Sequence, residues 1–519
     1  MSIGRVCHGM PAPDIRSANG GIYPSFRTHD QKTIEGDLFQ AFVAAGAISK
    51  ANADDPKKSS FVRCARTDKG VHAAGNVISL KLIVEDEDII RKINDNLAPQ
   101  IRVWGYERTN NSFSAYQMVD SRIYEYLIPT HSFLPPHPQS YLGRKCDEWA
   151  ERNGDVEGYK KRQEEVQGYW EKVDDEMIKP ILESYDPEAR SILEKALYLR
   201  GEQPAEDNEA ALPDETDRTV RPPPQDVLEP QKPDQTEGNG ADHPGPNEPA
   251  GGDAPQTGLH PRSPTVTEGI KKLRQAYSTA KRAYRIPKSR LERITEALDF
   301  FVGTRNYHNY TVQKTFRDPS AKRVIKSFVV NPTPILINGT EWLSLKVHGQ
   351  SFMMHQIRKM VGMVALVVRC GCDPKRMLDS FGPDNISIPK APSLGLLLER
   401  PIFDSYNKRA KADLGKEKID FDKYRAEIDE FKQREIYERM YRDEEKDNIF
   451  GSFFNQVDNF PNETFLFVTS GGIEATKISG HDRDKKSSIE HALVDADVDG
   501  DSDPDISSTV HDDSNGHEG

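Results

Sequence analysis

The feature that most constrains the fold of this chain is a long segment that cannot bury a core. Residues 201–262 hold 12 prolines, no aromatic residue and no isoleucine. Such a composition offers too little apolar surface to offset the conformational entropy that is lost on ordering. We therefore expect a disordered insertion over 201–262, and a second disordered segment in the acidic, Ser/Asp-rich tail over 481–519. The folded residues then divide into two blocks around the insertion.

The net charge of −13 is concentrated in those two segments. The insertion carries −10 and the tail −9, so the other residues have a formal charge of +6. A basic body is compatible with RNA binding, which a uniformly acidic protein would disfavour. The five cysteines form no CxxC pair, which is typical of a reducing compartment. No run of 18 apolar residues and no basic-then-apolar start occurs, so we expect neither a membrane span nor a secretory signal.

Both blocks mix helices with strands, which predicts an α+β fold. In the first block, periodicity predicts helices over 34–45 and 86–96 and strands over 76–82, 101–108 and 122–128. In the second block it predicts helices over 291–302 and 352–368 and strands over 324–331 and 342–347. We expect an N-terminal subdomain over 1–145, an insertion over 146–264, a C-terminal subdomain over 265–407 and a charged helical extension over 408–460.

The most unusual local composition is a polar loop over 63–72 that surrounds one acid, Asp68, with cations. Nearby positive charges and turn amides favour an ionised carboxylate, which a nucleophile or an electrostatic anchor requires. The alternative is a structural aspartate that caps a turn beside surface cations. A second alternative is a thiol nucleophile at Cys64 with His72 as its base, although a cysteine flanked by Val62 and Ala65 more often packs as a small apolar side chain.

Two further places offer polar chemistry on regular elements. Tyr124 and Tyr126 share one face of a predicted strand beside Arg122, which fits either a half-buried aromatic face or a platform on which RNA bases stack. His355 and Arg358 lie off the apolar stripe of the predicted 352–368 helix, where a solvated role and a functional role are both compatible with the pattern.

One string resembles the catalytic motif of the TruA-type tRNA pseudouridine synthases, namely Arg66-Thr67-Asp68-Lys69-Gly70-Val71-His72-Ala73. Five other stretches resemble that family in the same order, at 33–39, 122–126, 303–310, 349–362 and 388–400. The resemblance covers about 8–145 and 265–407. The sequences of these motifs resemble those of the eukaryotic, multisite branch of the family.

The resemblance implies two ferredoxin-like, RRM-like subdomains whose sheets join around a basic central cleft. It implies isomerisation of uridine in tRNA to pseudouridine without an organic cofactor, on a base that is flipped out of the RNA. Carried over by position, Asp68 is the catalytic nucleophile, and Tyr124, Arg66 and Arg358 act with it. The branch also implies small nuclear and messenger RNA as further substrates, a nuclear location and no obligate protein partner. No metal is expected in catalysis, and a structural zinc ion is compatible with the five cysteines.

We expect further residues of the same stretches to contact RNA: Arg63, Lys69, His72, Arg122, Tyr126, Arg305, Asn306, His308, His355 and Lys359. The alternative is a catalytically inactive RNA-binding or chaperone module of the same fold. The chain departs from the family pattern at its start. Family members open with a strand, whereas the segment over 1–6 is too short and polar to supply one. We therefore expect the first strand to be missing or truncated.

Overall fold

The computed structural model describes residues 2–4, 33–68, 70–198 and 263–477. The segments over 201–262 and 481–519, for which disorder is predicted, lie outside these residues. The chain divides into two compact units, one of Met1–Pro180 with Leu273–Gly519 and one of Ile181–Lys272. All the strands and all the predicted site residues that are described belong to the first unit.

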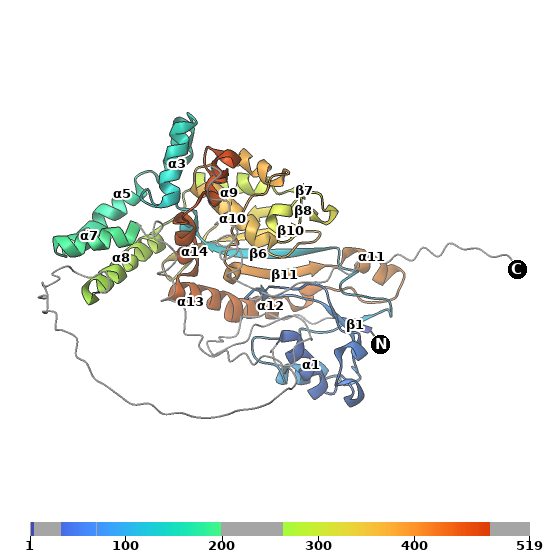
Figure 1. Ribbon diagram of the computed structural model, residues 1–519. Helices are drawn as coiled ribbons and strands as arrows, with labels where there is room; N and C mark the ends of the chain where they lie inside the picture. The colour runs from blue at the N-terminus through green and yellow to red at the C-terminus, as the bar shows by residue number, and fades with distance from the viewer. Residues whose placement is uncertain (1, 5–32, 69, 199–262, 478–519) are drawn as a thin grey trace, which may run out of the picture. The chain divides into compact units, whose positions relative to one another are not determined.

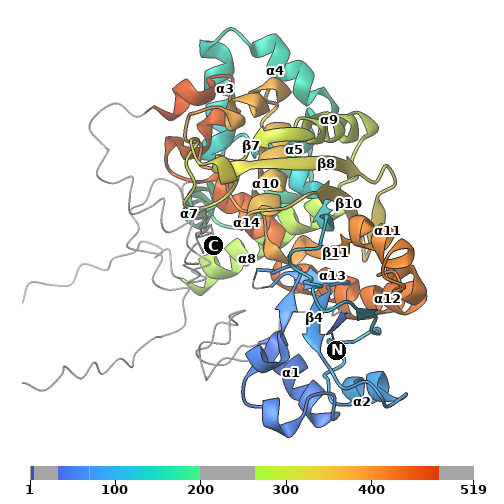
Figure 2. The same cartoon turned by 90° about the vertical axis from the view of Figure 1, so that its right-hand side faces the viewer.

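A four-stranded sheet occupies the N-terminal part of the first unit, in the order β2–β4–β1–β5. Its strands are β1 (Ser2–Gly4), β2 (Val62–Arg63), β4 (Ile78–Lys81) and β5 (Arg108–Thr109). Helices α1 (Ile34–Ala44) and α2 (Ile89–Asp95) share a buried apolar core with β4 (Figure 2). The Thr33 hydroxyl caps α1 by accepting the Gly36 N–H. These helices confirm the prediction in this region, and a strand of three residues stands where we expected a missing or truncated one.

The predicted strand over 101–108 is wrong for most of its length. The structure has only β5 there, at Arg108–Thr109. The side chain of Asn94 accepts the Val103 N–H at 2.8 Å and donates to the Val103 carbonyl at 2.9 Å. Because both backbone groups of Val103 are already bonded, its neighbours follow the end of α2 instead of a β-ladder.

A seven-stranded sheet forms the centre of the first unit, in the order β3–β11–β6–β10–β8–β7 with β9 paired to β10 (Figure 1). The first sequence block supplies β3 (His72–Ala73) and β6 (Ser121–Pro129). The second block supplies β7 (Gly303–Asn306), β8 (Lys322–Val330), β9 (Ile335–Ile337), β10 (Thr340–Gly349) and β11 (Leu396–Ile402). The two blocks therefore share one sheet, and the α+β class is confirmed.

The two faces of β6 carry different chemistry, because side chains alternate along a strand. Tyr124 and Tyr126 face the segment around Pro392, whose carbonyl accepts the Tyr126 hydroxyl at 2.6 Å. Glu125 faces the other way and accepts hydrogen bonds from Ser344 and from the Tyr437 hydroxyl. Tyr437 ends a π-helical segment, Lys432–Tyr437, between α12 (Arg425–Phe431) and α13 (Glu438–Asp447). Helices of the predicted C-terminal extension thus cover the face opposite to the tyrosines.

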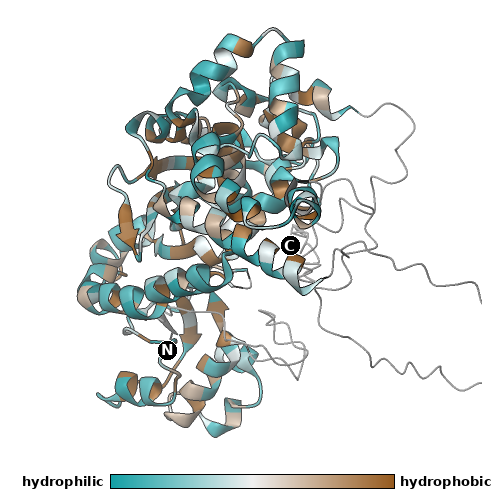
Figure 3. Ribbon diagram, turned by 90° about the vertical axis from the view of Figure 1, so that its left-hand side faces the viewer, coloured by the Kyte–Doolittle hydropathy of each residue, from teal (hydrophilic) through white to brown (hydrophobic). Residues whose placement is uncertain are grey.

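The remaining helices carry many hydrophilic residues (Figure 3). They are α3 (Tyr141–Arg152), α4 (Val156–Gln163), α5 (Tyr169–Val173), α6 (Lys179–Glu183), α7 (Pro187–Tyr198), α8 (Pro264–Ala283), α9 (Lys288–Asp299), α10 (Gln356–Arg369), α11 (Asp404–Ala412) and α14 (Ile449–Asp458). Four of them begin within 146–198, to which the sequence analysis assigned no structure. Trp170 and Val166 of that region lie in a small buried apolar cluster with Leu134 and Tyr284. Within the described ranges, we find no helix with the length and apolarity that a bilayer crossing requires.

Arg290 on α9 ties three elements of the first unit together. Its guanidinium is fully buried and donates to the carbonyls of Phe133 at 2.7 Å and Val368 at 3.1 Å. It also lies 3.2 Å from the Glu165 carboxylate. A buried charge with this many partners holds the end of α10 in place, and α10 carries predicted site residues.

We predict that Arg290→Met lowers the free energy of unfolding by about 3–5 kcal/mol, because it breaks a buried ion pair with Glu165 and removes the guanidinium bonds to the Phe133 and Val368 carbonyls. Urea denaturation followed by circular dichroism measures the change. Lys288→Met on the exposed side of α9, where the lysine side chain is 89% exposed, is the matched control. Equal unfolding midpoints for the two variants would show that Arg290 is not such a link.

Candidate active site

The loop that carries Asp68 is fixed at both ends by the two sheets. It leaves the four-stranded sheet after β2 and enters the seven-stranded sheet at β3, where His72 pairs in parallel with Leu397. Inside the loop, the Asn76 side chain donates to the Ala65 carbonyl at 3.1 Å. The loop turns at Gly70, whose φ of +76° favours glycine. Asp68 therefore lies on a rigid connection between the two sheets.

The carboxylate of Asp68 contacts two side chains of the second sequence block. His355 Nδ1 lies 2.9 Å from Oδ2, and Arg358 Nη1 lies 3.9 Å from the same oxygen. Burial opposes ionisation of this carboxyl, but the hydrogen bond from His355 and the positive charges of His355, Arg358 and Lys390 outweigh it. Together they hold the pKa of Asp68 below its usual value, so the group is a carboxylate at neutral pH.

Helix α10 delivers both of these partners. His355 is its N-cap residue and has a left-handed backbone with φ of +59°, which directs its imidazole to Asp68. Arg358 donates from Nε to the Ala391 carbonyl at 2.7 Å, and the Ala391 N–H donates back to the Arg358 carbonyl. At Gly362, a Cβ atom would lie 2.3 Å from the Pro389 carbonyl oxygen. The glycine therefore lets the 389–391 segment lie directly against α10.

Tyr124 lies close enough to Asp68 for the two groups to interact electrostatically. Its ring packs edge-to-face on Phe352, with centroids 5.2 Å apart. Burial, together with the negative charge of Asp68, raises the pKa of the phenol, so Tyr124 is neutral. Arg122, two residues earlier on β6, donates to the Cys64 carbonyl at 2.6 Å and so joins the strand to the Asp68 loop.

The thiol alternative at Cys64 is wrong. Cys64 is fully buried, and its Sγ lies 2.9 Å from Asn76 Oδ1. Burial raises the pKa of the thiol to about 11, which leaves almost no thiolate at neutral pH. His72 is 1% exposed and is a residue of β3, where it belongs to the sheet.

Several predicted RNA-binding residues have structural partners instead. Tyr126 has no exposed surface and its hydroxyl is bonded to Pro392, so its predicted role as a stacking platform is corrected to a core role. His308 is 3% exposed, Arg63 is ion-paired with Glu35, and Lys359 is buried against two backbone carbonyls.

Arg305 and Asn306 also bond locally. Arg305 donates to the Phe300 carbonyl at 3.3 Å and lies over the Phe381 ring, while Asn306 donates to the Phe316 carbonyl at 2.7 Å. Arg66 is exposed on the Asp68 loop. Lys69 lies outside the described residues.

Lys390 is the site residue that the sequence analysis missed. Its charge acts on Asp68, as do those of His355 and Arg358. The only signal in the sequence is its position between Pro389 and the pair Ala391-Pro392, a rigid setting for a basic residue beside an apolar strand. His355, which we expected to contact RNA, instead contacts Asp68 directly.

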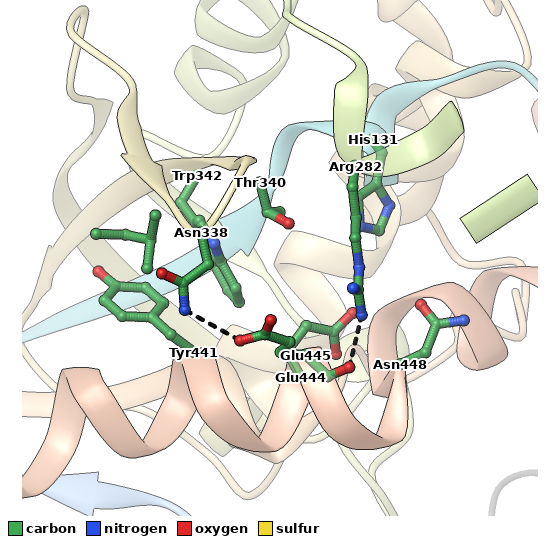
Figure 4. Close-up of a pocket in the computed structure, with 10 residues that line it drawn as sticks. His131, Arg282, Asn338, Thr340, Trp342, Tyr441, Glu444, Glu445 and Asn448 are labelled. Atoms are coloured by element: carbon green, nitrogen blue, oxygen red, sulfur yellow. Dashed lines mark hydrogen bonds between the residues drawn. The ribbon is translucent and has the colours of Figure 1, made fainter. Parts of the chain in front are cut away.

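The small cavity shown in Figure 4 is a structural feature that the residues around Asp68 do not line. It encloses about 10 Å³ between the β9–β10 turn and α13, which is space for a single water molecule. Asn338 and Arg282 donate to the side chain and the backbone carbonyl of Glu445 there. These bonds join the turn to the C-terminal extension. Within the described residues, no three His, Cys, Asp or Glu side chains gather closely enough to hold a metal ion.

The known proteins that this chain resembles agree with one another in their names. A family model described as tRNA pseudouridine synthase matches residues 297–404. Over 446 residues the chain is 43% identical to tRNA pseudouridine synthase 1 of Yarrowia lipolytica, covering 85% of this chain and 73% of that protein. It is 40% identical to the protein of the same name from Schizosaccharomyces pombe, covering 85% and 82%. It is 30% identical to the tRNA pseudouridine(27/28) synthase of Saccharomyces cerevisiae, covering 84% and 96%.

We predict that Asp68→Asn destabilises the protein at neutral pH, because it removes the negative charge on which the hydrogen bond of His355 and the charges of Arg358 and Lys390 act. A depressed pKa stabilises the fold above the usual carboxyl range, and this contribution is lost as the pH falls through the folded-state pKa. The melting temperatures of variant and wild type should therefore differ at pH 7 and converge once the pH falls below the lowered pKa of Asp68. Asp429→Asn, exposed on α12, is the control and should match wild type throughout. A difference in melting temperature that does not depend on pH would contradict the electrostatic explanation.

Proposed function

The chain belongs to the tRNA pseudouridine synthases and isomerises uridine in tRNA to pseudouridine, and from that premise we propose that Asp68 is the residue that acts on the target nucleotide. The observation that carries the proposal is the pair of contacts to its carboxylate from His355 at 2.9 Å and Arg358 at 3.9 Å. These contacts come from a helix almost 300 residues away in the sequence. An apolar residue in place of Asp68 would pack at least as well, so these contacts are not explained by packing alone.

The reaction exchanges one bond to the ribose for another and needs no external electron donor or acceptor. The bond between uracil N1 and ribose C1′ breaks, the uracil rotates, and C5 bonds to C1′. C5 then loses its proton and N1 gains one, so atoms and electrons balance. Asp68 enters either by adding to C1′ or by removing a ribose proton. Both routes start from an ionised Asp68 carboxylate. In both, the positive charges around Asp68 are already in place before the reaction begins.

The surrounding cations have two tasks in this proposal. His355, Arg358 and Lys390 keep Asp68 ionised despite its burial. Arg66, exposed on the same loop, and Arg122 beside it on β6 are placed to bind RNA phosphates. The cations thus support both the chemistry and the docking of the substrate.

Tyr124, which is 6% exposed, and the half-buried Phe352 form an aromatic pair beside Asp68. A uridine inside folded tRNA must leave its stack before Asp68 can reach C1′, which costs a few kcal/mol. An aromatic ring in the site replaces part of the lost stacking. We therefore assign Tyr124 to holding the extruded uracil while it rotates.

From the family resemblance alone, we extend the proposal to uridines in small nuclear and messenger RNA and to a nuclear location. Mapping pseudouridine in nuclear RNA from cells with and without the protein tests both. Sites that vanish with the protein support the extension. Loss confined to tRNA would restrict the substrate to tRNA.

We predict that Asp68→Ala abolishes isomerisation and leaves the Kd for tRNA within about threefold of wild type, because phosphate contacts dominate binding. Tritium release from tRNA labelled at uridine C5 measures turnover, and filter binding measures affinity. Asp429→Asn is the control for both assays. Parallel loss of binding and turnover would assign Asp68 to docking instead of chemistry.

We predict that His355→Ala moves the acid limb of the kcat profile to higher pH. The hydrogen bond and charge of His355 lower the pKa of Asp68, so their removal raises it and the carboxylate protonates earlier as the pH falls. His355→Asn, which keeps a donor in a residue that tolerates a left-handed backbone, should restore part of the shift. An unshifted profile with reduced kcat would reduce His355 to a packing role.

A further inference from the structure

A cavity of about 490 Å³ lies beside the Asp68 site in the first unit. Its size falls in the range of roughly 300–1,000 Å³ that small-ligand pockets occupy. It lies between the 387–394 segment and the C-terminal extension.

The cavity is next to the active site but distinct from it. Neither Asp68 nor Tyr124 lines it, whereas Arg358 lines it and also contacts Asp68. Ser393 lines it and lies against the Asp68 loop, because a Cβ atom at Gly70 would be 2.9 Å from Ser393 Oγ. The 389–393 segment is therefore a wall with the Asp68 site on one side and the cavity on the other.

The cavity has a basic side. Arg358, Lys359 and Lys390 line it, while Asp447 is the one acid among the lining residues. The Lys359 ammonium donates to the carbonyls of Asn309 and Thr311, so it adds positive charge to this side of the cavity but no direct contact to a ligand. The neighbouring charges of Lys359 and Lys390 disfavour each other, and an anion bound at the Lys390 side stabilises both. This side of the cavity suits a phosphate.

The α14 side of the cavity is apolar and aromatic, with Phe453 and Phe460 as its rings. Thr464 lines this part, is 8% exposed, and has a hydroxyl with no hydrogen-bond partner among the described residues. A buried hydroxyl costs free energy unless a ligand or water bonds to it. Gln456, also in the lining, adds an amide that can donate and accept. An aromatic surface with a few polar groups suits a nucleobase.

Resting on the proposed function, we propose that this cavity is a second nucleotide site, which takes a nucleotide flanking the target uridine in the same RNA. Its base packs against Phe453 with its edge toward Thr464 and Gln456, and its phosphate lies at the Lys390 side. The target and its neighbour are then held on opposite sides of the 389–393 wall. The site both selects the sequence or shape around the target and helps to hold the opened RNA strand.

The test is an abasic scan in a double-mutant cycle. The uridine that the wild type modifies is mapped first, and tRNAs are then made that lack the base at each flanking position in turn. We expect one position where loss of the base weakens wild-type binding roughly tenfold, as expected for a lost base–aromatic stack. In Phe453→Ala the same loss should change the Kd less than twofold, because the stacking partner is already absent. Asn455→Ala, exposed on α14 and outside the lining, should behave as wild type.

The proposal would be overturned if no abasic position weakened the binding of tRNA to the wild type. It would also be overturned if Phe453→Ala and base removal each raised the Kd independently, so that their effects multiplied. Wild-type affinity of Phe453→Ala for intact tRNA would point to an occupant other than RNA and would also overturn it. Phe453→Leu and Thr464→Val, which conserve volume, repeat the cycle if the alanine variant unfolds. Pseudouridine is measured in the same wild-type samples, and its absence there would overturn the proposed function instead.

Discussion

The contact between His355 and Asp68 is the constraint on which the rest of this site depends. Asp68 is held by a loop that spans both sheets, and His355 begins a helix from the other sequence block. A half-buried carboxylate stays ionised most readily when cations and hydrogen-bond donors lie against it. Here the charge and its partners meet because β6 of the first block pairs with β10 and β11 of the second. The fold that joins the blocks and the chemistry that needs a charged aspartate are therefore the same feature.

Much of this arrangement could be predicted from the sequence, because local patterns carry it. The apolar stripe of α10 and the alternation of β6 identified both elements to within a few residues. The string around Asp68 identified the candidate carboxylate. Patterns of this kind report which side a residue faces, since burial follows the period of the element.

What a side chain contacts across the fold does not follow from local patterns. Tyr126 shares its face with Tyr124, yet Pro392 covers one ring while the other lies near Asp68. Lys390 acquires its role only because Gly362 lets its segment approach α10. The strand predicted near Val103 is replaced by side-chain bonds from Asn94, which no periodicity reports. Side-chain contacts between separate segments thus decided these errors and this omission.

The C-terminal extension gives the site a second side. Its helices cover the opposite face of the central sheet through Glu125 and Tyr437, and α14 supplies the far wall of the cavity behind the 389–393 segment. In our proposal, the extension is part of the surface that an RNA strand meets beside Asp68. The most direct test of the account is a structure of Asp68→Asn bound to substrate tRNA. The account predicts a target uridine out of its stack, with its ribose C1′ in contact with residue 68 and its uracil against Tyr124. A target uridine still stacked in the tRNA, or bound away from residue 68, would contradict it.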